Sequence, residues 1–600
     1  MKRNQISLKI LLNIVIILTC TIQVGYGLTP PSQKQITSYK KDGSFEKRKS
    51  RAFKFKNHIM SPKFIQKQAA LKGMEYTLPS GIMQPMPSVG HVKMLVLLID
   101  FSDHPATRTK DQMEAIISGH GGNYPYDSLK HFYARASYNK LNLDATVLGW
   151  YRPKYPRSNI SQNTSGRENL IKEALKYYDE QGHDFSQYDN NHDGYVDYLA
   201  VYWTGPDNGW GNFWWGYSTG FSEDGPALDN VRFARYTWQW ESKSPKVLIH
   251  ETGHALGLPD LYDYNSNIGP LGGVGGLDIM DGVQGDFNPY FKWLLDWTTP
   301  KILSFGTQKI TLNASGSTEQ NNSVILWKDA NLDNPFSEFF IVQNRWKTHN
   351  DVDYLTNGLL IWHIDGRLNK ENTWRFNNSN TSHKFIRLME ADGLEEIEQN
   401  YWVDRGDYYK EGDSFSDITN PNSKKYNGTK SGISLSNISI NSKNETISFI
   451  ATAGKSKPDF KPVLKAYGTI IHGAEGTVRM IISVGEYNGG ITTDTLKITI
   501  PKNNHIRLIF DNGKKEQAGK VVENQNWKMR ETDSLYIFEY IGDNGVFPPK
   551  TLSRLGVDLH FTSPVSSKGR FELTVTVVKN SAEVNDRNNK DSEIIEYNSF

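Results

Sequence analysis

Residues 250–260, which read HETGHALGLPD, decide how the central part of this chain folds. Two histidines four positions apart lie on one face of an α-helix, so the side chains of His250 and His254 are expected to point the same way. Gly257 can end that helix in a left-handed conformation, and Pro259 then prevents the helix from resuming. The chain must therefore turn back sharply after the second histidine.

Imidazoles in this arrangement can occupy two corners of a zinc tetrahedron. Glu251 follows the first histidine and is placed to accept a proton from a water molecule held at an open coordination position. The turn after the helix brings Asp260 back as a third ligand, which is the metzincin layout HExxHxxGxxH with Asp in the last position. The alternative interpretation is a buried helix with two hydrogen-bonded histidines.

The third ligand can also be argued by exclusion. No Glu follows Glu251 before Glu319, so the downstream glutamate of thermolysin-like sites has no counterpart here. Asp260 has the metzincin spacing and is the predicted ligand. Asp263 is the alternative, and otherwise it is a carboxylate that supports the site or a turn.

A metzincin also carries a methionine in a tight turn beneath the metal. Residues 277–282, LDIMDG, follow a glycine-rich stretch at 269–276 and supply Met280 for that role. A buried methionine is otherwise ordinary core packing. Gly282 stands where some metzincins have a tyrosine two residues after the methionine, so Tyr262 and Tyr264 are the available substitutes.

Further motifs, in the same order along the chain, make the sequence similar to the M6 family of secreted metallopeptidases, the immune inhibitor A-like group. The matching stretches are 96–103 (VLLIDFSD), 132–138 (FYARASY), 149–151 (GWY), 250–263, 358–365 (GLLIWHID), 390–393 (EADG), 415–417 (FSD) and 420–423 (NPNS). The resemblance covers roughly residues 90 to 450. It implies a zinc endopeptidase with a metzincin-like core that is often stabilised by calcium.

Residues 189–197, DNNHDGYVD, have the oxygen-rich spacing of a calcium-binding loop with glycine at the sixth position. The predicted ligands are Asp189, Asn191, Asp193, the carbonyl of Tyr195, and Asp197. Position 12 of the loop is Ala200 rather than a bidentate Glu, which excludes an EF-hand. The alternative is a turn rich in Asp and Asn that is stabilised by its own side chains.

The first 27 residues are typical of a secretory signal peptide, with Lys2 and Arg3 before an apolar stretch too short to span a bilayer. The secreted chain is therefore expected outside the cell. Residues 28–88 are basic and are predicted to be a propeptide or leader, or else a disordered segment. Cys20 is the only cysteine, so the mature chain has no disulfide and no thiolate to cap a zinc ion.

The remaining chain is predicted to be α+β. Residues 89–300 form the zinc peptidase core, with a mixed twisted sheet and the HExxH helix, and residues 301–454 continue it as a β-rich region. Residues 460–600 contain evenly spaced strand-like runs, for example 477–484 and 571–577, and are predicted to form a β-sandwich-like accessory domain.

Composition narrows the partners. The net charge of +2 gives no strong case for a nucleic acid partner. No second apolar stretch is long enough to span a membrane, so no stable insertion is expected after the signal is removed. An aromatic cluster between Trp203 and Tyr217 either walls a substrate cleft or forms a small core of its own.

The predicted function is hydrolysis of peptide bonds in polypeptides by a zinc-activated water, with Glu251 as general base. Polypeptide substrates follow from the family resemblance, because the zinc motif alone would equally allow a small-molecule amidase. The competing hypothesis is a secreted adhesin or binding protein on an inactive protease scaffold. Retention of both histidines, Glu251, Asp260 and Met280 favours the enzyme.

Overall fold

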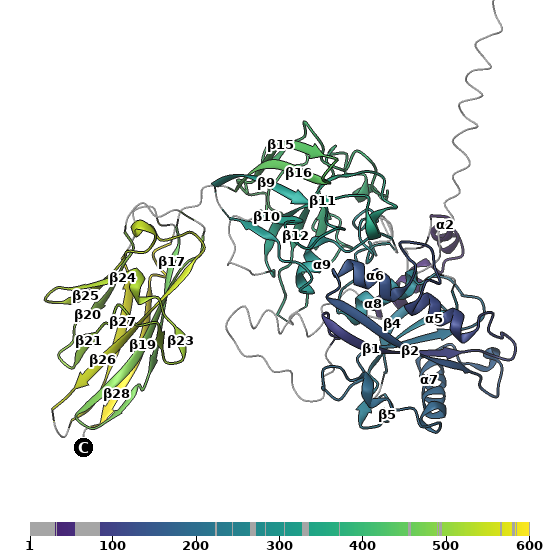
Figure 1. The fold of residues 1–600 in the computed structure, drawn as a ribbon, viewed down its shortest axis with the longest axis horizontal. Helices are drawn as coiled ribbons and strands as arrows, with labels where there is room; N and C mark the ends of the chain where they lie inside the picture. The colour runs from purple at the N-terminus through teal and green to yellow at the C-terminus, as the bar shows by residue number, and fades with distance from the viewer. Residues whose placement is uncertain are drawn as a thin grey trace, which may run out of the picture.

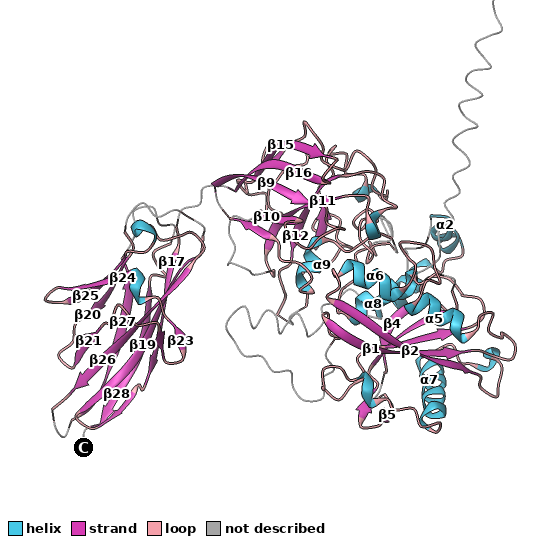
Figure 2. Cartoon of the chain, viewed as in Figure 1, coloured by secondary structure: helices cyan, strands magenta, loops and turns pink. Residues whose placement is uncertain are grey.

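The computed structural model describes residues 31, 33–54 and 85–598, except for 223–224, 243, 265–271, 283, 305, 327–334, 371–372, 454–457, 489, 491–494, 565–566, 579–582 and 584. Within these residues every α-helix lies before residue 300, and the later part of the chain is built from strands (Figure 2). The predicted α+β class is confirmed. The predicted signal peptide lies outside the described residues.

A five-stranded mixed sheet forms the centre of the first half of the chain. In sheet order its strands are β2 (Leu141–Tyr151), β1 (Gly90–Ile99), β3 (Leu199–Trp203), β7 (Arg235–Trp240) and β4 (Tyr217–Gly220). Neighbouring strands run parallel except β4, which is antiparallel to β7. A short hairpin of β5 (Ala227–Leu228) and β6 (Val231–Arg232) lies between β4 and β7 in the sequence.

The apolar run in β1 explains why this strand lies inside the sheet, between β2 and β3, rather than at its edge. Strand residues alternate between two faces, and both faces of β1 are buried. Val96 and Leu98 belong to one hydrophobic cluster, whereas Leu95 and Leu97 belong to another. The sheet therefore separates two cores.

Helices cover both faces of this sheet (Figure 1). They are α5 (Lys110–Ser118), α6 (Leu129–Ala136), α7 (Thr164–Asp179), α8 (Lys246–Ala255) and α9 (Pro289–Leu294). The apolar residues of α5, α6, α8 and α9 join the first cluster, and those of α7 join the second. Side-chain caps fix where several helices begin, as when Ser128 accepts a hydrogen bond from the His131 amide at 3.1 Å.

Two sheets follow the last helix. The first has the order β13 (Ile386–Leu388), β12 (Gly358–Asp365), β11 (Glu338–Arg345), β10 (Ser323–Leu326) and β8 (Lys301–Leu303). The second has the order β14 (Phe415–Ser416), β15 (Ser434–Asn441), β16 (Thr446–Ala453) and β9 (Gly306–Asn313). Ile341 and Trp362 of the first sheet belong to the same cluster as α8, so this sheet shares a core with the helix that carries both histidines.

A buried charge network also joins these two parts of the chain. Arg345, at the end of β11, pairs with Asp351 at 2.7 Å and donates a second hydrogen bond to the Leu277 carbonyl at 3.1 Å. The backbone amide of Asp286 donates to Asp351, and the Asp286 carboxylate pairs with Lys292 at 2.7 Å. The network thus reaches the predicted methionine turn from far along the sequence.

The C-terminal strands form two further sheets around one core. The first sheet contains β17 (Phe460–Tyr467), β19 (Glu475–Glu486), β26 (Leu552–Thr562) and β21 (Ile506–Ile509). The second contains β18 (Ile470–His472), β28 (Lys590–Asn598), β27 (Lys568–Val577), β20 (Lys497–Pro501), β25 (Leu535–Tyr540) and β24 (Trp527–Glu531). A hairpin of β22 (Glu516–Gln517) and β23 (Lys520–Val521) completes the region. Apolar residues of both sheets share one hydrophobic cluster.

Part of the basic segment at residues 28–88 is folded. Helices α2 (Gln33–Lys41) and α3 (Phe45–Lys54) lie against the loop that contains Trp210. The rings of Phe45 and Trp210 stack 6.1 Å apart, and Arg48 donates to the Trp210 carbonyl at 2.8 Å. These residues are therefore not the disordered segment that their composition allows.

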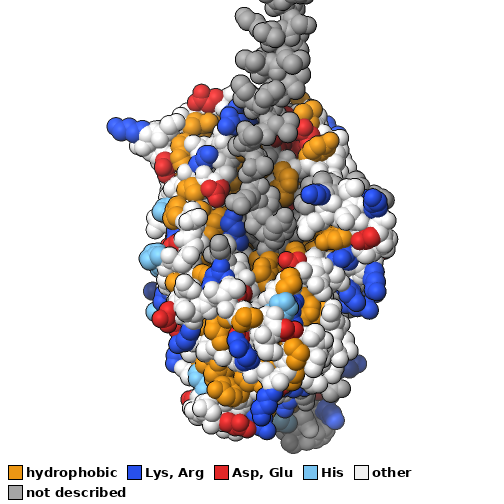
Figure 3. All heavy atoms as spheres, turned by 90° about the vertical axis from the view of Figure 1, so that its right-hand side faces the viewer, with side chains coloured by type: hydrophobic (Ala, Val, Ile, Leu, Met, Phe, Trp, Pro, Cys, Tyr) orange, Lys and Arg blue, Asp and Glu red, His pale blue; other side chains and the backbone are white. Residues whose placement is uncertain are grey.

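One face of the molecule carries charges of both signs (Figure 3). On the face shown in Figure 3, lysine and arginine side chains are interspersed with aspartate, glutamate and apolar ones. None of the helices in the described ranges is long and apolar enough to cross a membrane.

The Arg345–Asp351 pair gives a test of how the two parts are joined. Asp351→Ala strands a buried guanidinium, and removing one partner of a buried pair costs about 3–5 kcal/mol. We expect a loss of that size in chemical denaturation followed by tryptophan fluorescence. Glu180→Ala, which breaks an exposed pair with Lys176, should change stability by less than about 0.5 kcal/mol. Equal losses in the two variants would contradict the role given to the network.

Candidate metal centre

Helix α8 holds the centre of the site and ends where the sequence predicts. Its last helical residue is Ala255, and Gly257 has a φ of +92°, a conformation that favours glycine. The Leu258 amide donates back to the Gly253 carbonyl at 3.0 Å, which closes the end of the helix. The chain then reverses, and the Leu261 amide bonds to the Met280 carbonyl at 2.9 Å. Asp260 is thereby returned to the helix.

His250, His254 and Asp260 come together in the interior. Oδ1 of Asp260 lies 3.0 Å from Nε2 of His250 and 3.2 Å from Nε2 of His254. All three side chains are buried. Ligands about 2.0–2.1 Å from one zinc ion at tetrahedral angles lie roughly 3.3 Å apart, so these separations match two edges of a zinc tetrahedron.

The hydrogen bonds of the two imidazoles show that no proton lies between His250, His254 and Asp260. Nδ1 of His250 contacts the Ile279 carbonyl at 2.8 Å, and Nδ1 of His254 contacts the Leu258 carbonyl at 2.8 Å. A carbonyl only accepts, so both Nδ1 atoms carry the proton and the Nε2 atoms of the neutral rings present lone pairs. The lone pairs of the two Nε2 atoms and one oxygen of Asp260 therefore converge on the same point. A single added proton could bind to only one of the two nitrogens and would leave the other without a partner. The donor set fits a metal cation.

The second oxygen of Asp260 is held by a tyrosine that the sequence analysis did not assign to this role. The hydroxyl of Tyr264 donates to Oδ2 of Asp260 at 2.7 Å and lies 2.6 Å from the hydroxyl of Tyr262. Although burial opposes it, the neighbouring imidazoles of His254 and His250 hold the pKa of Asp260 below its ordinary value. Burial raises the pKa of Tyr264 well above its ordinary value, so its hydroxyl remains a donor.

The alternative ligand Asp263 lies elsewhere. It is fully buried and accepts a hydrogen bond from Thr381 at 3.4 Å. Among the described residues, the group of His and carboxylate atoms close enough to share one metal here contains Asp260 and not Asp263. Both aspartates are buried, so burial does not distinguish the candidate ligand from the alternative, whereas the spacing from His254 does.

Glu251 is also fully buried, on the same helix as the two histidines. Its carboxylate oxygens have no hydrogen-bond partner of normal geometry among the described residues. Burial raises the pKa of Glu251 to about 8, with the Asp260 charge adding to the rise and His250 opposing it. A carboxyl group with such a pKa can take up and release a proton near neutral pH.

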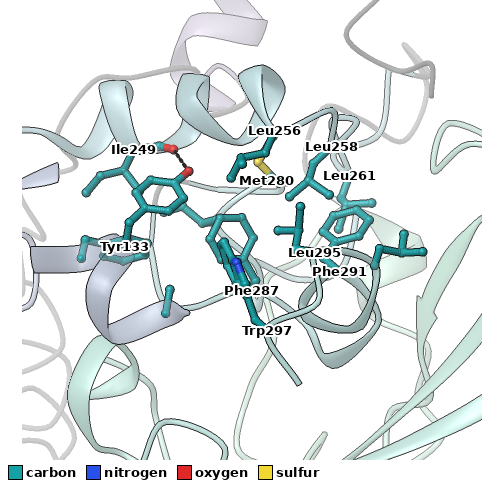
Figure 4. Packing of buried hydrophobic residues seen from close by; sticks show 14 of the residues in the cluster. Tyr133, Ile249, Leu256, Leu258, Leu261, Met280, Phe287, Phe291, Leu295 and Trp297 are labelled. Atoms are coloured by element: carbon teal, nitrogen blue, oxygen red, sulfur yellow. Dashed lines mark hydrogen bonds between the residues drawn. The ribbon is translucent and has the colours of Figure 1, made fainter. Parts of the chain in front are cut away.

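Met280 lies directly against the helix that carries the histidines, as Figure 4 shows. A Cβ atom on Gly253 would collide with the sulfur of Met280, so the turn and the helix are in close contact. The carboxylate of Asp278 accepts a hydrogen bond from the Met280 amide at 2.7 Å and shapes the turn. Burial raises the pKa of Asp278 to about 7. The assignment of Met280 to a metzincin methionine turn stays a prediction.

Trp402 packs against the turn that contains Met280, and this contact could not be anticipated from the sequence. Its ring occupies the space that a side chain would need at Gly276 and Gly282. The neighbouring Val403 amide donates to the Gly275 carbonyl at 3.1 Å. Glycine at position 282 is therefore required by the packing of Trp402 from a distant segment.

The predicted calcium loop is well ordered by its own hydrogen bonds. Asp189 accepts from the Asp193 and Gly194 amides at 3.0 and 2.9 Å, and Asp197 accepts from the amide of Asn190 at 2.6 Å. The side-chain Nδ2 of Asn191 donates to the other oxygen of Asp197 at 2.9 Å. Burial raises the pKa of Asp197 to about 6. Calcium binding by Asp189, Asn191, Asp193, Tyr195 and Asp197 stays a prediction.

The aromatic cluster forms a core rather than an open wall. Its members are buried and belong to the second hydrophobic cluster; they are Trp203, Trp210, Phe213, Trp214, Trp215 and Tyr217. Trp210 lies between the leader and the site, because its ring is 6.1 Å from Phe45 and 6.4 Å from Tyr264. The aromatic residues therefore belong to the core on one face of the five-stranded sheet, and they form neither an open cleft wall nor a small core of their own.

Comparison with known proteins adds an independent finding. Residues 85–282 match the family model of the immune inhibitor A peptidase M6, catalytic domain, which confirms the resemblance given above. The chain is 27% identical over 228 residues to the pre-pro-metalloprotease PrtV of Vibrio cholerae, a match that covers 28% of this chain and 25% of PrtV. It is 24% identical over 231 residues to Immune inhibitor A of Bacillus thuringiensis, covering 28% of this chain and 33% of that protein.

Both matches thus span a third or less of the relatives' own length. Among solved structures, the CARDB domain of the PF1109 protein from Pyrococcus furiosus is similar over 24% of this chain and 90% of that chain, at 14% identity and a TM-score of 0.15. A score this low carries no argument about fold or function.

The contact between Gly253 and Met280 can be tested by adding one methyl group. Alanine normally stabilises a helix by about 1 kcal/mol relative to glycine. At Gly253 we expect the opposite, because overpacking a dense core costs about 1–3 kcal/mol. Differential scanning calorimetry should show a lower Tm for Gly253→Ala. Gly149→Ala, where the added atom would meet only the Tyr178 hydroxyl at 3.6 Å, is the control; a higher Tm for Gly253→Ala would contradict the assignment.

Proposed function

We propose that this chain, whose residues 85–282 match the immune inhibitor A peptidase M6 catalytic domain, is a secreted zinc-dependent endopeptidase that hydrolyses peptide bonds in polypeptides. His250, His254 and Asp260 would hold the zinc ion, and Glu251 would act as general base. One observation carries the proposal: three buried acceptors converge on one point with no proton donor between them.

The protein groups have separate tasks in this mechanism. When bound, zinc supplies a Lewis acid that polarises the scissile carbonyl and lowers the pKa of a water molecule. Glu251 accepts the proton of that water and delivers it to the leaving amine. The carbonyls of Ile279 and Leu258 hold the imidazoles in the tautomer that leaves Nε2 free to bind. Tyr264 holds Asp260 in its orientation.

Secretion, calcium and the division of the chain belong to the same proposal. Residues 1–27 would be removed as a signal peptide and residues 28–88 would serve as the basic leader. Residues 89–300 would be the metzincin-like core with its Met280 turn, residues 301–454 its continuation, and residues 460–600 a β-sandwich-like accessory domain. Calcium at residues 189–197 would be structural.

Replacement of Glu251 is the first test of the mechanism. We expect Glu251→Ala to lose casein cleavage by at least about a thousandfold while it retains one zinc ion per chain, because Glu251 moves the proton and does not bind the metal. Zinc content would be measured by mass spectrometry of both purified proteins. Equal cleavage by the variant would remove Glu251 from the mechanism. Zinc without cleavage in the parent, after removal of residues 28–88, would favour the binding protein on an inactive scaffold.

Zinc affinity tests the ligands and the tyrosine behind them. We expect Asp260→Ala to lose stoichiometric zinc and Asp263→Ala to keep it. Tyr264→Phe should weaken zinc binding by about 10–100-fold, the usual effect of losing a hydrogen bond to a ligand. Tyr133→Phe is the matched control, because its hydroxyl bonds to the Ile249 carbonyl on the same helix and to no ligand. Competition with a chromogenic chelator gives the affinities; equal values for Tyr264→Phe and Tyr133→Phe would contradict the role of Tyr264.

A further inference from the structure

A second group of acids converges far from the histidines in the sequence. Ligand atoms of Glu390, Asp392, Glu396 and Asp407 all lie within 4.8 Å of one another. The acids follow strand β13 and flank the short helix η4 (Ile397–Gln399). We propose that residues 390–407 form a calcium-binding loop with these four carboxylates as ligands, distinct from the loop at 189–197.

Burial makes this cluster different from an exposed acidic patch. Glu390 and Asp407 are 2% and 1% exposed. Each uses one oxygen to accept a backbone amide, from Glu396 at 2.6 Å and from Asp404 at 2.7 Å. The other oxygen of each is buried and has no hydrogen-bond partner in the described structure, and the same holds for one oxygen of Glu396. Leaving a buried carboxylate oxygen unsatisfied is costly, so these atoms require a positive partner.

The protein itself does not supply that partner. The nearby cations are committed to other acids: Arg387 pairs with Glu395 at 2.9 Å and with Glu398 at 3.2 Å, and Lys384 also pairs with Glu398. No ion pair among the described residues involves any of the four clustered acids.

The backbone around the cluster leaves room for the carboxylates. A Cβ atom at Gly406 would collide with the Oδ2 atom of Asp392 and would lie 3.0 Å from Oδ1 of Asp404. Glycine at this position therefore lets two carboxylates approach the main chain. All the donors are oxygen atoms, which selects a hard cation, and Ca²⁺ accepts six to eight oxygen ligands in flexible geometry. Zinc prefers the nitrogen and sulfur donors that this loop lacks.

Because of where residues 390–407 lie, a cation bound there would also affect the site formed by His250, His254 and Asp260. Trp402 and Val403 lie within the loop and contact Gly275, Gly276 and Gly282, which surround the Met280 turn. A bound ion that fixes residues 390–407 would therefore stabilise the Met280 turn, which packs against the helix that carries the two histidines. This consequence rests on the proposed function, whereas the calcium site itself does not.

The test uses the full chain with Glu251→Ala as the background, so that it does not depend on proteolysis. Calcium binding would be measured by isothermal titration calorimetry with CaCl₂ after chelator treatment. We expect Glu390→Gln/Asp407→Asn to lose one calcium ion per chain, or to bind it at least about tenfold more weakly, because affinity follows the number of charged ligands. Glu411→Gln/Asp413→Asn removes the same charge from the next loop and should bind as the background does. Unchanged stoichiometry and affinity in the first variant would overturn the proposal.

Stability provides a second readout with a characteristic sign. Without calcium, the Glu390→Gln/Asp407→Asn variant should melt at or above the temperature of the background, because like charges have been removed. With calcium, only the background and the Glu411→Gln/Asp413→Asn control should gain their full rise in Tm. A rise of equal size in all three proteins would assign the calcium effect to another site, including residues 189–197.

A third measurement needs no variant in the loop. Hydrogen exchange of the Glu251→Ala protein, with and without CaCl₂, should show protection in peptides that cover residues 390–407. Protection confined to residues 189–197, or no change at 390–407, would overturn the proposal even if the loop variants fail to fold. MgCl₂ at the same concentration should protect less, because Mg²⁺ demands a smaller octahedral site and retains its water.

Discussion

The convergence of unprotonated acceptors in a buried site is the constraint on which the rest of this structure depends. Oδ1 of Asp260 lies within 3.2 Å of two imidazole nitrogens whose protons are on the far side of their rings. Such an arrangement is unfavourable by itself, because none of the three groups can donate to another. It is maintained because the helix end, the turn at Met280 and the Tyr264 hydroxyl each fix one member.

The surrounding fold makes this arrangement rigid. The histidines lie on a helix that packs into the main core, so their spacing does not depend on loops. The turn beneath them is held from three directions: the Leu261 amide bonds to Met280, Arg345 reaches the Leu277 carbonyl, and Trp402 covers the neighbouring glycines. Two of these contacts come from the β-rich region after residue 300. The β-rich region therefore helps to hold the site in place.

How much of this follows from sequence depends on the separation of the residues involved. The helix, its end at Gly257 and the return of Asp260 are encoded within eleven consecutive residues, and local geometry was sufficient to predict them. The choice between a cleft wall and a core for the tryptophans needed the burial of the folded protein. Arg345, Trp402 and the stacking of Phe45 on Trp210 join distant segments, and no periodicity or spacing encodes such contacts. Tyr264 lies only four residues after Asp260 in the sequence, but the sequence does not show that its hydroxyl points toward the Asp260 carboxylate.

The buried acids of the chain can be ordered by how each is satisfied. Asp278 accepts from backbone and asparagine amides, Asp351 faces Arg345, and Asp260 faces two imidazoles and a tyrosine. Glu390 and Asp407 have only half of their oxygens satisfied, and neither forms an ion pair with any of the described residues. A chain whose single cysteine is at position 20 has no disulfide to hold its later loops together. Carboxylates that require a cation then provide a crosslink of another kind, because an ion bound by residues before and after Trp402 closes that loop as a disulfide would.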